Sequence, residues 1–203
     1  MSIVSFMAQQ QERKIVVGAG NFQSGSGGYQ GLSIGGHAQG IKGDVYLSTR
    51  KLKVKKLKST DYKFNADDET ITITVGGGNS WQEVMELANS TLTPDESEKF
   101  IYVPFCAPTS DQVSIAGSLT SHGHSRSSAF GGGYMPEEVE RFSLVTRMGS
   151  KVVKLSVSRT TLPELFYALP GSFGRGGIVT DVTLRLQRIP KNSRVLMTVT
   201  RYD

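Results

Sequence analysis

The chain has 203 residues, of which 37% are hydrophobic and 20% are charged, and its formal net charge at pH 7 is +5. This length and composition allow a sizeable hydrophobic core and exclude an intrinsically disordered protein. The single cysteine, Cys106, excludes internal disulfides, and no apolar run approaches the roughly 18 residues that span a bilayer. The first residues lack the basic region of a secretion signal, so we expect a cytoplasmic protein.

The first part of the chain predicts short strands around a long glycine-rich loop. Residues 3–11 are typical of a short helix, and Ile15, Val16 and Val17 of a buried strand that glycine ends. The next predicted strand is 44–48. Long alternating segments begin at Leu52, which places a lobe boundary near residue 50.

Much of the positive charge lies in one alternating run, RKLKVKKLK, from Arg50 to Lys58. We interpret this run as a solvated or edge strand, because lysines often protect exposed strand edges. The alternative is a nucleic-acid patch. Since no aromatic residue interleaves with the lysines to stack on bases, nucleic acid is the weaker hypothesis and no nucleic-acid partner is predicted.

Strands and helices alternate in the rest of the chain. Thr and Ile alternate in a strand that ends at Gly76–Gly78, and Asn79 is predicted to open a helix, with Gln82 at the capping-box position. A hairpin, a short helix with proline in its first turn, and a long strand follow at 139–158, 162–169 and 177–190. The mixture indicates an α+β fold class.

Two glycine-rich stretches are candidates for function. VGAGNFQSG, Val17–Gly25, leaves a strand through glycines that let backbone N–H groups converge on an anion such as a pyrophosphate. It lacks the complete spacing of a Rossmann fingerprint, and an ordinary glycine turn is the alternative.

The second stretch, GSLTSHGHSRSS, holds His122 and His124. A zinc site needs three or four ligands, and neither a cysteine pair nor a carboxylate cluster completes one here, so we predict no metal. The chain also lacks the G-x-S-x-G motif of a nucleophile elbow. Packed, hydrogen-bonded loop histidines remain an alternative to a functional role.

The sequence from Val103 to Val152 resembles the central motif of the FAD-binding domain of the vanillyl-alcohol oxidase superfamily, also called the p-cresol methylhydroxylase (PCMH) type. The positions at matching intervals are Pro108, Val113, Ala116, Gly117, Gly123, His124, Ser127, Ser128, Val139, Leu144, Val145 and Thr146. The resemblance continues through VVGAGNFQSG, TITVGGGNSWQEVMELA and LPELFYALPGSFGRGGIVTDVTLRL, and so covers almost the whole chain. The segment 164–180 is most similar to sugar and aldonolactone oxidoreductases, including the decaprenylphosphoryl-ribose oxidase type.

The resemblance implies a two-lobed α+β fold with FAD between the lobes. We expect a small α/β lobe at 1–48, with the pyrophosphate loop at 17–25, and a larger lobe at 49–190 in which helices flank an antiparallel sheet. Members usually continue into a cap domain that binds the substrate. We expect this cap to be missing here, with 191–203 its first residues or a tail, and the chain alone to be poorly active.

The resemblance also implies which residues bind the cofactor. The residues that hold the pyrophosphate are Gly18, Ala19, Gly20, Asn21, Phe22, Gln23 and Ser24. Those that line the flavin and diphosphate are Pro108, Thr109, Ser110, Val113, Ser114, Gly117, Ser118, Ser121, Gly123, His124 and Ser125. Those near the adenosine half are Gly171, Gly177 and Ile178.

Two positions bear on how FAD is held. Some members link FAD through a histidine of the pyrophosphate loop, where this chain has Asn21, or through a cysteine directly before Pro-Thr, where Ala107 separates Cys106 from that pair. We therefore predict that FAD is bound non-covalently. His124 matches the histidine of the motif, whereas His122 and Ser125 replace its asparagine and glycine.

The implied function is that of a flavin-dependent oxidoreductase, which transfers a hydride from a hydroxyl-bearing sugar, lactone or alcohol to FAD. No catalytic residue is assigned. The alternatives are a non-enzymatic FAD-binding module that meets a partner protein and, third, a basic nucleic-acid-binding domain.

Overall fold

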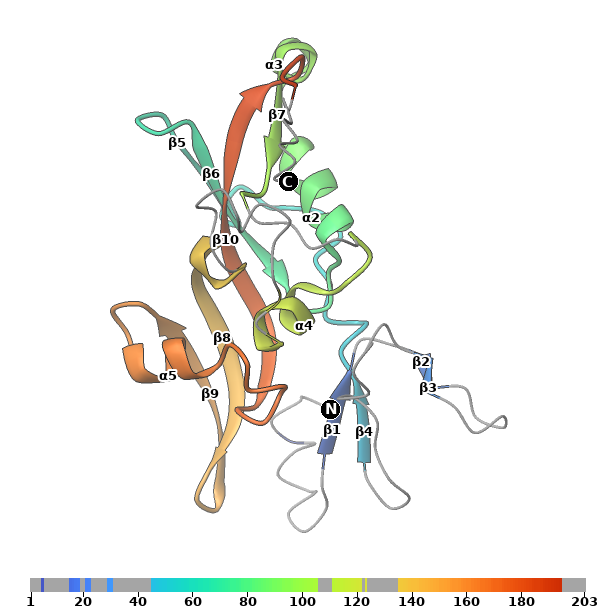
Figure 1. Cartoon of the computed structure of the whole chain (residues 1–203), viewed down its shortest axis with the longest axis vertical. Coiled ribbons are helices and arrows are strands. Elements are labelled where there is room, and N and C mark those ends of the chain that lie inside the picture. Colours follow the sequence, from blue (N-terminus) through green and yellow to red (C-terminus); the bar gives the residue numbers. More distant parts are fainter. Residues whose placement is uncertain are drawn as a thin grey trace, which may run out of the picture.

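The computed structural model describes Ser5 and residues 15–18, 21–22, 29–30, 45–105, 111–121, 123 and 135–194. Apart from Ser5, the predicted helix at 3–11 lies outside these residues. The described part combines helices with a curled antiparallel sheet, which confirms the α+β class (Figure 1). None of its helices is long and apolar enough to cross a lipid bilayer.

A six-stranded antiparallel sheet contains most of the hydrophobic core. Its strands are β5 (Tyr62–Asn65), β6 (Thr70–Gly76), β7 (Phe100–Val103), β8 (Val139–Met148), β9 (Lys151–Ser158) and β10 (Ile178–Pro190). The order is β5-β6-β10-β8-β9, and β7 pairs with the last residues of β10. The predicted hairpin and long strand are thereby confirmed as β8–β9 and β10.

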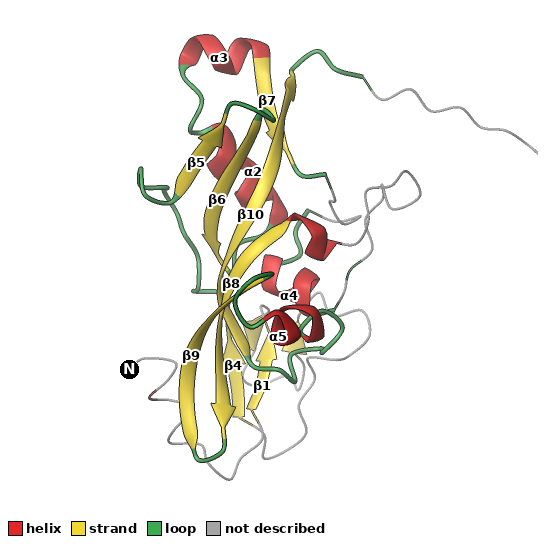
Figure 2. Cartoon of the chain, turned by 90° about the vertical axis from the view of Figure 1, so that its left-hand side faces the viewer, coloured by secondary structure: helices red, strands yellow, loops and turns green. Residues whose placement is uncertain are grey.

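The strand β10 is the centre of this sheet and runs along much of its length (Figure 2). It pairs with β6 through Val182↔Val75 and Leu184↔Ile73, and these four side chains are completely buried. Alternate residues of the two strands therefore cover one face of the sheet with apolar side chains, as the alternating sequence predicts.

Two short strands form a separate parallel pair, β1 (Ile15–Gly18) and β4 (Val45–Ser48). Their register places Ile15 opposite Val45 and Gly18 opposite Ser48. Both strands were predicted from their apolar runs. A further two-stranded antiparallel pair joins β2 (Asn21–Phe22) to β3 (Tyr29–Gln30).

Short helices pack on the sheet: α2 (Trp81–Asn89), α3 (Pro94–Lys99), α4 (Ile115–Thr120), α5 (Pro163–Ala168) and the 3-10 turn η2 (Met135–Glu138). The helix α5 begins with proline as predicted. The predicted N-cap of α2 is wrong by one residue, because Ser80 is the cap and forms the capping box with Glu83. The sequence analysis did not identify α3, β7 or α4, although Thr93, Pro94 and Glu96 provide α3 with a capping box and a proline in its first turn.

The predicted strand at Arg50–Lys58 is also wrong, because this segment forms a turn followed by irregular chain. The Leu52 carbonyl oxygen accepts a hydrogen bond from Gly78, and both backbone groups of Val54 bond to the Asn79 side chain. These bonds replace those of a strand ladder. The alternating apolar residues still pack inward, since Val54 and Leu57 are half-buried against the core.

Two glycines before β10 provide a test of close backbone packing. A Cβ on Gly177 (φ +138°) would lie 2.5 Å from the Val145 carbonyl oxygen, whereas one on Gly174 (φ +79°) would meet nothing within 4 Å. We expect Gly174→Ala to lower the free energy of unfolding by about 1 kcal/mol, the cost of its backbone conformation. Gly177→Ala adds a backbone clash and should cost about 3 kcal/mol or more. Equal losses in urea denaturation would contradict this explanation.

Candidate functional site

Three consecutive glycines, Gly76–Gly78, lead from the end of β6 toward α2, and other backbone segments meet them at what we call the junction. A Cβ on Gly76 would lie 2.2 Å from the Leu52 carbonyl oxygen, and one on Gly77 would lie 2.5 Å from that of Val179. A Cβ on Gly78 would lie 2.2 Å from the Thr49 carbonyl oxygen. Only glycine allows these backbones to approach so closely.

Hydrogen bonds extend this junction to α4. Gly78 N–H donates to the Leu52 carbonyl (2.8 Å) and Gly77 N–H donates to that of Thr180 (2.9 Å). The Gly77 carbonyl in turn accepts a bond of 3.0 Å from Ala116 N–H in α4. The chain after β4, the start of β10 and the helix α4 therefore meet at one place.

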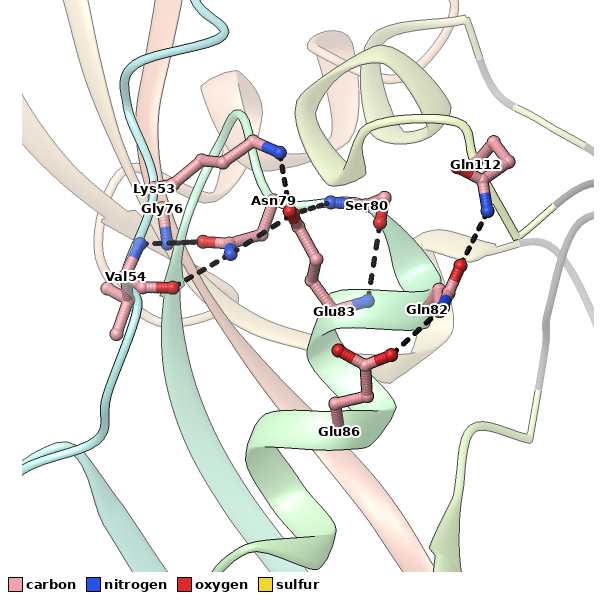
Figure 3. A network of polar contacts seen from close by, with 9 residues as sticks. All are labelled: Lys53, Val54, Gly76, Asn79, Ser80, Gln82, Glu83, Glu86 and Gln112. Carbon is pink, nitrogen blue, oxygen red and sulfur yellow. Dashed lines mark hydrogen bonds and ion pairs between the residues drawn. The ribbon is translucent and has the colours of Figure 1, made fainter.

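Asn79 holds the junction together with its side chain (Figure 3). Its Oδ1 accepts bonds from the N–H groups of Val54 (2.8 Å) and Gly76 (3.0 Å), and its Nδ2 donates to the Val54 carbonyl (2.9 Å). The residue is only 1% exposed. Buried backbone groups need hydrogen-bond partners, so this amide supplies them to a segment that is not paired with a strand.

Glu83 adds a charged contact at the edge of the same network. It accepts a bond from Ser80 N–H (2.9 Å) and forms an ion pair with Lys53. Burial alone would raise the pKa of the Glu83 carboxyl, but the bonds from Lys53 and Ser80 outweigh it, so the pKa lies below its ordinary value of 4.5. The ion pair therefore attaches the segment after β4 to α2 at neutral pH.

The helix α4 carries most of the described residues of the predicted flavin segment. Ser114 is its N-cap and accepts a bond from Gly117 N–H, while Gly117 and Ser121 are exposed. Ser118 instead faces the core, where its hydroxyl accepts a bond from Trp81 Nε1 (3.0 Å) and donates to the Ser114 carbonyl (3.0 Å). The Ser118 side chain thus connects α4 with α2.

The predicted adenosine segment lies next to α4. Phe173 N–H donates to the Thr120 carbonyl at the end of α4 (2.9 Å), and Gly171 is exposed nearby in the sequence. Ile178 is 1% exposed and packs with Val145, with Leu47 of β4 against them. Its side chain belongs to the core that joins β4 to the large sheet.

Other predicted residues cannot be placed in this arrangement. Gly18, Asn21 and Phe22 are described only as strand backbone, Val113 is half-buried before α4, and Gly123 follows its end. The rest lie outside the described residues: Ala19, Gly20, Gln23, Ser24, Pro108, Thr109, Ser110, His124 and Ser125. Their role in binding FAD stays a prediction.

The residues that matter most at this junction were absent from the predicted set. Sequence reasoning interpreted Gly76–Gly78 as the end of a strand and Asn79 as a helix cap. The sequence signal that could have indicated this junction was the run of three glycines directly before Asn79. Within the described ranges no group of three or more His, Cys, Asp or Glu could hold a metal ion, while Cys106 and all three histidines lie outside them.

We expect Asn79→Ala to lower the free energy of unfolding by about 2 to 4 kcal/mol, because it leaves the N–H groups of Val54 and Gly76 buried without a partner. The matched control is Gln82→Ala, on the exposed side of the same helix turn, which should change stability by no more than about 0.5 kcal/mol. Urea denaturation measures both, and a loss below about 1 kcal/mol for Asn79→Ala would contradict its role.

Glu83→Gln tests the ion pair through pH. Because the pKa of Glu83 is depressed in the folded protein, its stabilising effect is fully present above the unfolded pKa and is lost as the pH falls through the folded one. The wild type should therefore exceed Glu83→Gln in stability at pH 7, and the difference should shrink below about pH 4.5. Thermal melts across this pH range measure the difference. For the control Glu86→Gln, whose side chain is exposed, the difference from the wild type should not shrink with falling pH.

No protein-family model matches the chain. Curated relatives include cytokinin dehydrogenase 8 from Oryza sativa subsp. indica and subsp. japonica, each 28% identical over 169 residues, which are 81% of this chain and 29% of the relative. Cytokinin dehydrogenase 5 from subsp. japonica is 27% identical over 166 residues, 81% of this chain and 28% of the relative. The chain spans less than a third of the length of these relatives. The similarity supports the FAD-binding PCMH-type superfamily but not the sugar and aldonolactone oxidoreductases as its nearest members.

Proposed function

We propose that this chain is the FAD-binding domain of a flavin-dependent oxidoreductase. The observation that carries the proposal is the junction at Gly76–Gly78, where the end of β4, the start of β10 and α4 meet. The sequence resemblance assigns cofactor contacts to α4 and to the chain before β10. The fold thus brings together segments that are far apart in the sequence and share one predicted ligand.

The described residues fit a flat cofactor that must approach the backbone closely. Gly117 in α4 and its C-cap residue Ser121 are exposed, and the half-buried neighbours Ala116 and Thr120 are also small. The parallel pairing of β1 and β4 aligns Gly18, which belongs to the predicted pyrophosphate loop, with Ser48. A loop that holds a diphosphate would therefore begin next to the junction.

Bound FAD would supply the redox chemistry by accepting a hydride, while this domain would bind and orient the cofactor. We propose non-covalent binding, since Asn21 cannot form the histidine linkage. The predicted substrate is a hydroxyl-bearing sugar, lactone or alcohol. Because the similar proteins are named for cytokinin, a substrate screen of the whole protein should include a cytokinin beside these compounds.

Exchange of both Gly18 and Gly20 for valine should weaken FAD binding at least about tenfold, because side chains there would keep the backbone N–H groups from the diphosphate. Isothermal calorimetry with FAD provides the measurement. The control is Gly149→Val in the β8–β9 turn, where a Cβ would meet nothing within 4 Å. Because the φ of Gly149 is +60°, valine there costs stability, so thermal melts must show that both variants are folded at the temperature of the titration. Full FAD affinity in the double variant would refute the loop assignment.

Acid precipitation of the FAD-loaded protein tests the mode of attachment. Non-covalent FAD should be released completely into the supernatant. A yellow pellet with a mass increase of one FAD would show a covalent bond and contradict this part of the proposal.

A further inference from the structure

The ends of β1 and β4 lie side by side. In a parallel pair both strands end at the same edge, and here Gly18 is opposite Ser48. The chain that continues from β1 is the predicted diphosphate loop, and the chain that continues from β4 begins Thr49-Arg50-Lys51. Figures 1 and 2 show both strands running toward α4.

The segment after β4 forms a fixed turn. Leu52 N–H donates to the Thr49 carbonyl (2.8 Å), so Arg50 and Lys51 occupy the two central positions. Thr49 is 4% exposed, and its carbonyl packs against Gly78 so closely that a Cβ there would lie 2.2 Å away. The turn is therefore held against the junction while its two central residues are exposed.

Neither cation is neutralised by the part of the chain that the structure describes. The Arg50 and Lys51 side chains make no ion pair or hydrogen bond with any described residue. Lys53, two residues further on, differs because it is paired with Glu83. Two positive charges that lack a partner among the described residues, on a turn closed by the Leu52–Thr49 bond, are suited to an anionic group at the same edge.

We infer that Arg50 and Lys51 supply the positive charge that balances the FAD diphosphate, an inference that rests on the proposed FAD-binding function. Backbone N–H groups of a glycine loop carry only partial charges, whereas a diphosphate carries two negative charges. The remaining lysines of the run do not share this position. Lys55 and Lys56 follow Val54, whose backbone is bonded to Asn79, and lie further along the chain from the Gly18–Ser48 pair.

The test compares two double variants with equal loss of charge. Arg50→Gln/Lys51→Gln removes the cations of the turn, and Lys55→Gln/Lys56→Gln removes exposed cations from the same run. FAD affinity is measured by calorimetry at about 20 mM and about 500 mM salt, which differ strongly in electrostatic screening. Thermal melts report folding, and the single variants Arg50→Gln and Lys51→Gln replace the double variant if it unfolds.

We expect Arg50→Gln/Lys51→Gln to bind FAD about tenfold more weakly than the wild type at low salt, because two partly screened ion pairs are lost. This difference in affinity should become smaller at high salt. The FAD affinity of Lys55→Gln/Lys56→Gln should remain within about twofold of that of the wild type. Wild-type affinity in the turn variant, or an equal loss in both variants, would overturn the inference and leave the proposed function intact. A wild-type chain that binds no FAD would overturn both.

Discussion

The structure depends on the contact of backbone with backbone at Gly76–Gly78. The segment after β4 and the strand β10 approach these glycines so closely that any Cβ would meet a carbonyl oxygen, and hydrogen bonds of the same glycines join both of them to α4. Because the contact leaves no room for side chains on these three glycines, main chain packs directly against main chain there. Segments distant in sequence thereby acquire a defined position around the proposed cofactor site.

A single buried amide makes this arrangement possible. The chain after β4 must cross the core without a strand partner, and buried backbone groups without partners are costly. Asn79 provides both an acceptor and a donor to Val54, so its side chain takes the place of a neighbouring strand. Leu52, Val54 and Leu57 can then pack inward while the cations between them stay largely exposed.

Elements with a clear local pattern could be predicted from the sequence. Alternation of Thr and Ile identified β6, in which Ile71, Ile73 and Val75 are buried, and a proline marked the first turn of α5. A similar alternation was misleading at Arg50–Lys58, where the backbone bonds to a loop and not to a strand. The helix α4 contains Gly, Ser and Thr, which are weak helix formers, and depends on tertiary contacts such as the Trp81–Ser118 bond. No local pattern reveals such contacts, nor that the Ser118 side chain faces the core.

Stability and ligand binding are coupled by this construction. The residues that position α4 and the cationic turn are those of the junction, so a change that loosens the junction also displaces both sides of the proposed site. A ligand that binds only the folded protein stabilises it in proportion to the logarithm of its free concentration over its Kd, once that ratio is large. FAD bound beside α4 and the end of β4 would therefore offset part of the cost of a weakened junction. The loss of stability that a junction variant shows without ligand reports the effect of that variant on the fold, and the gain on adding FAD reports how well the junction still presents the site.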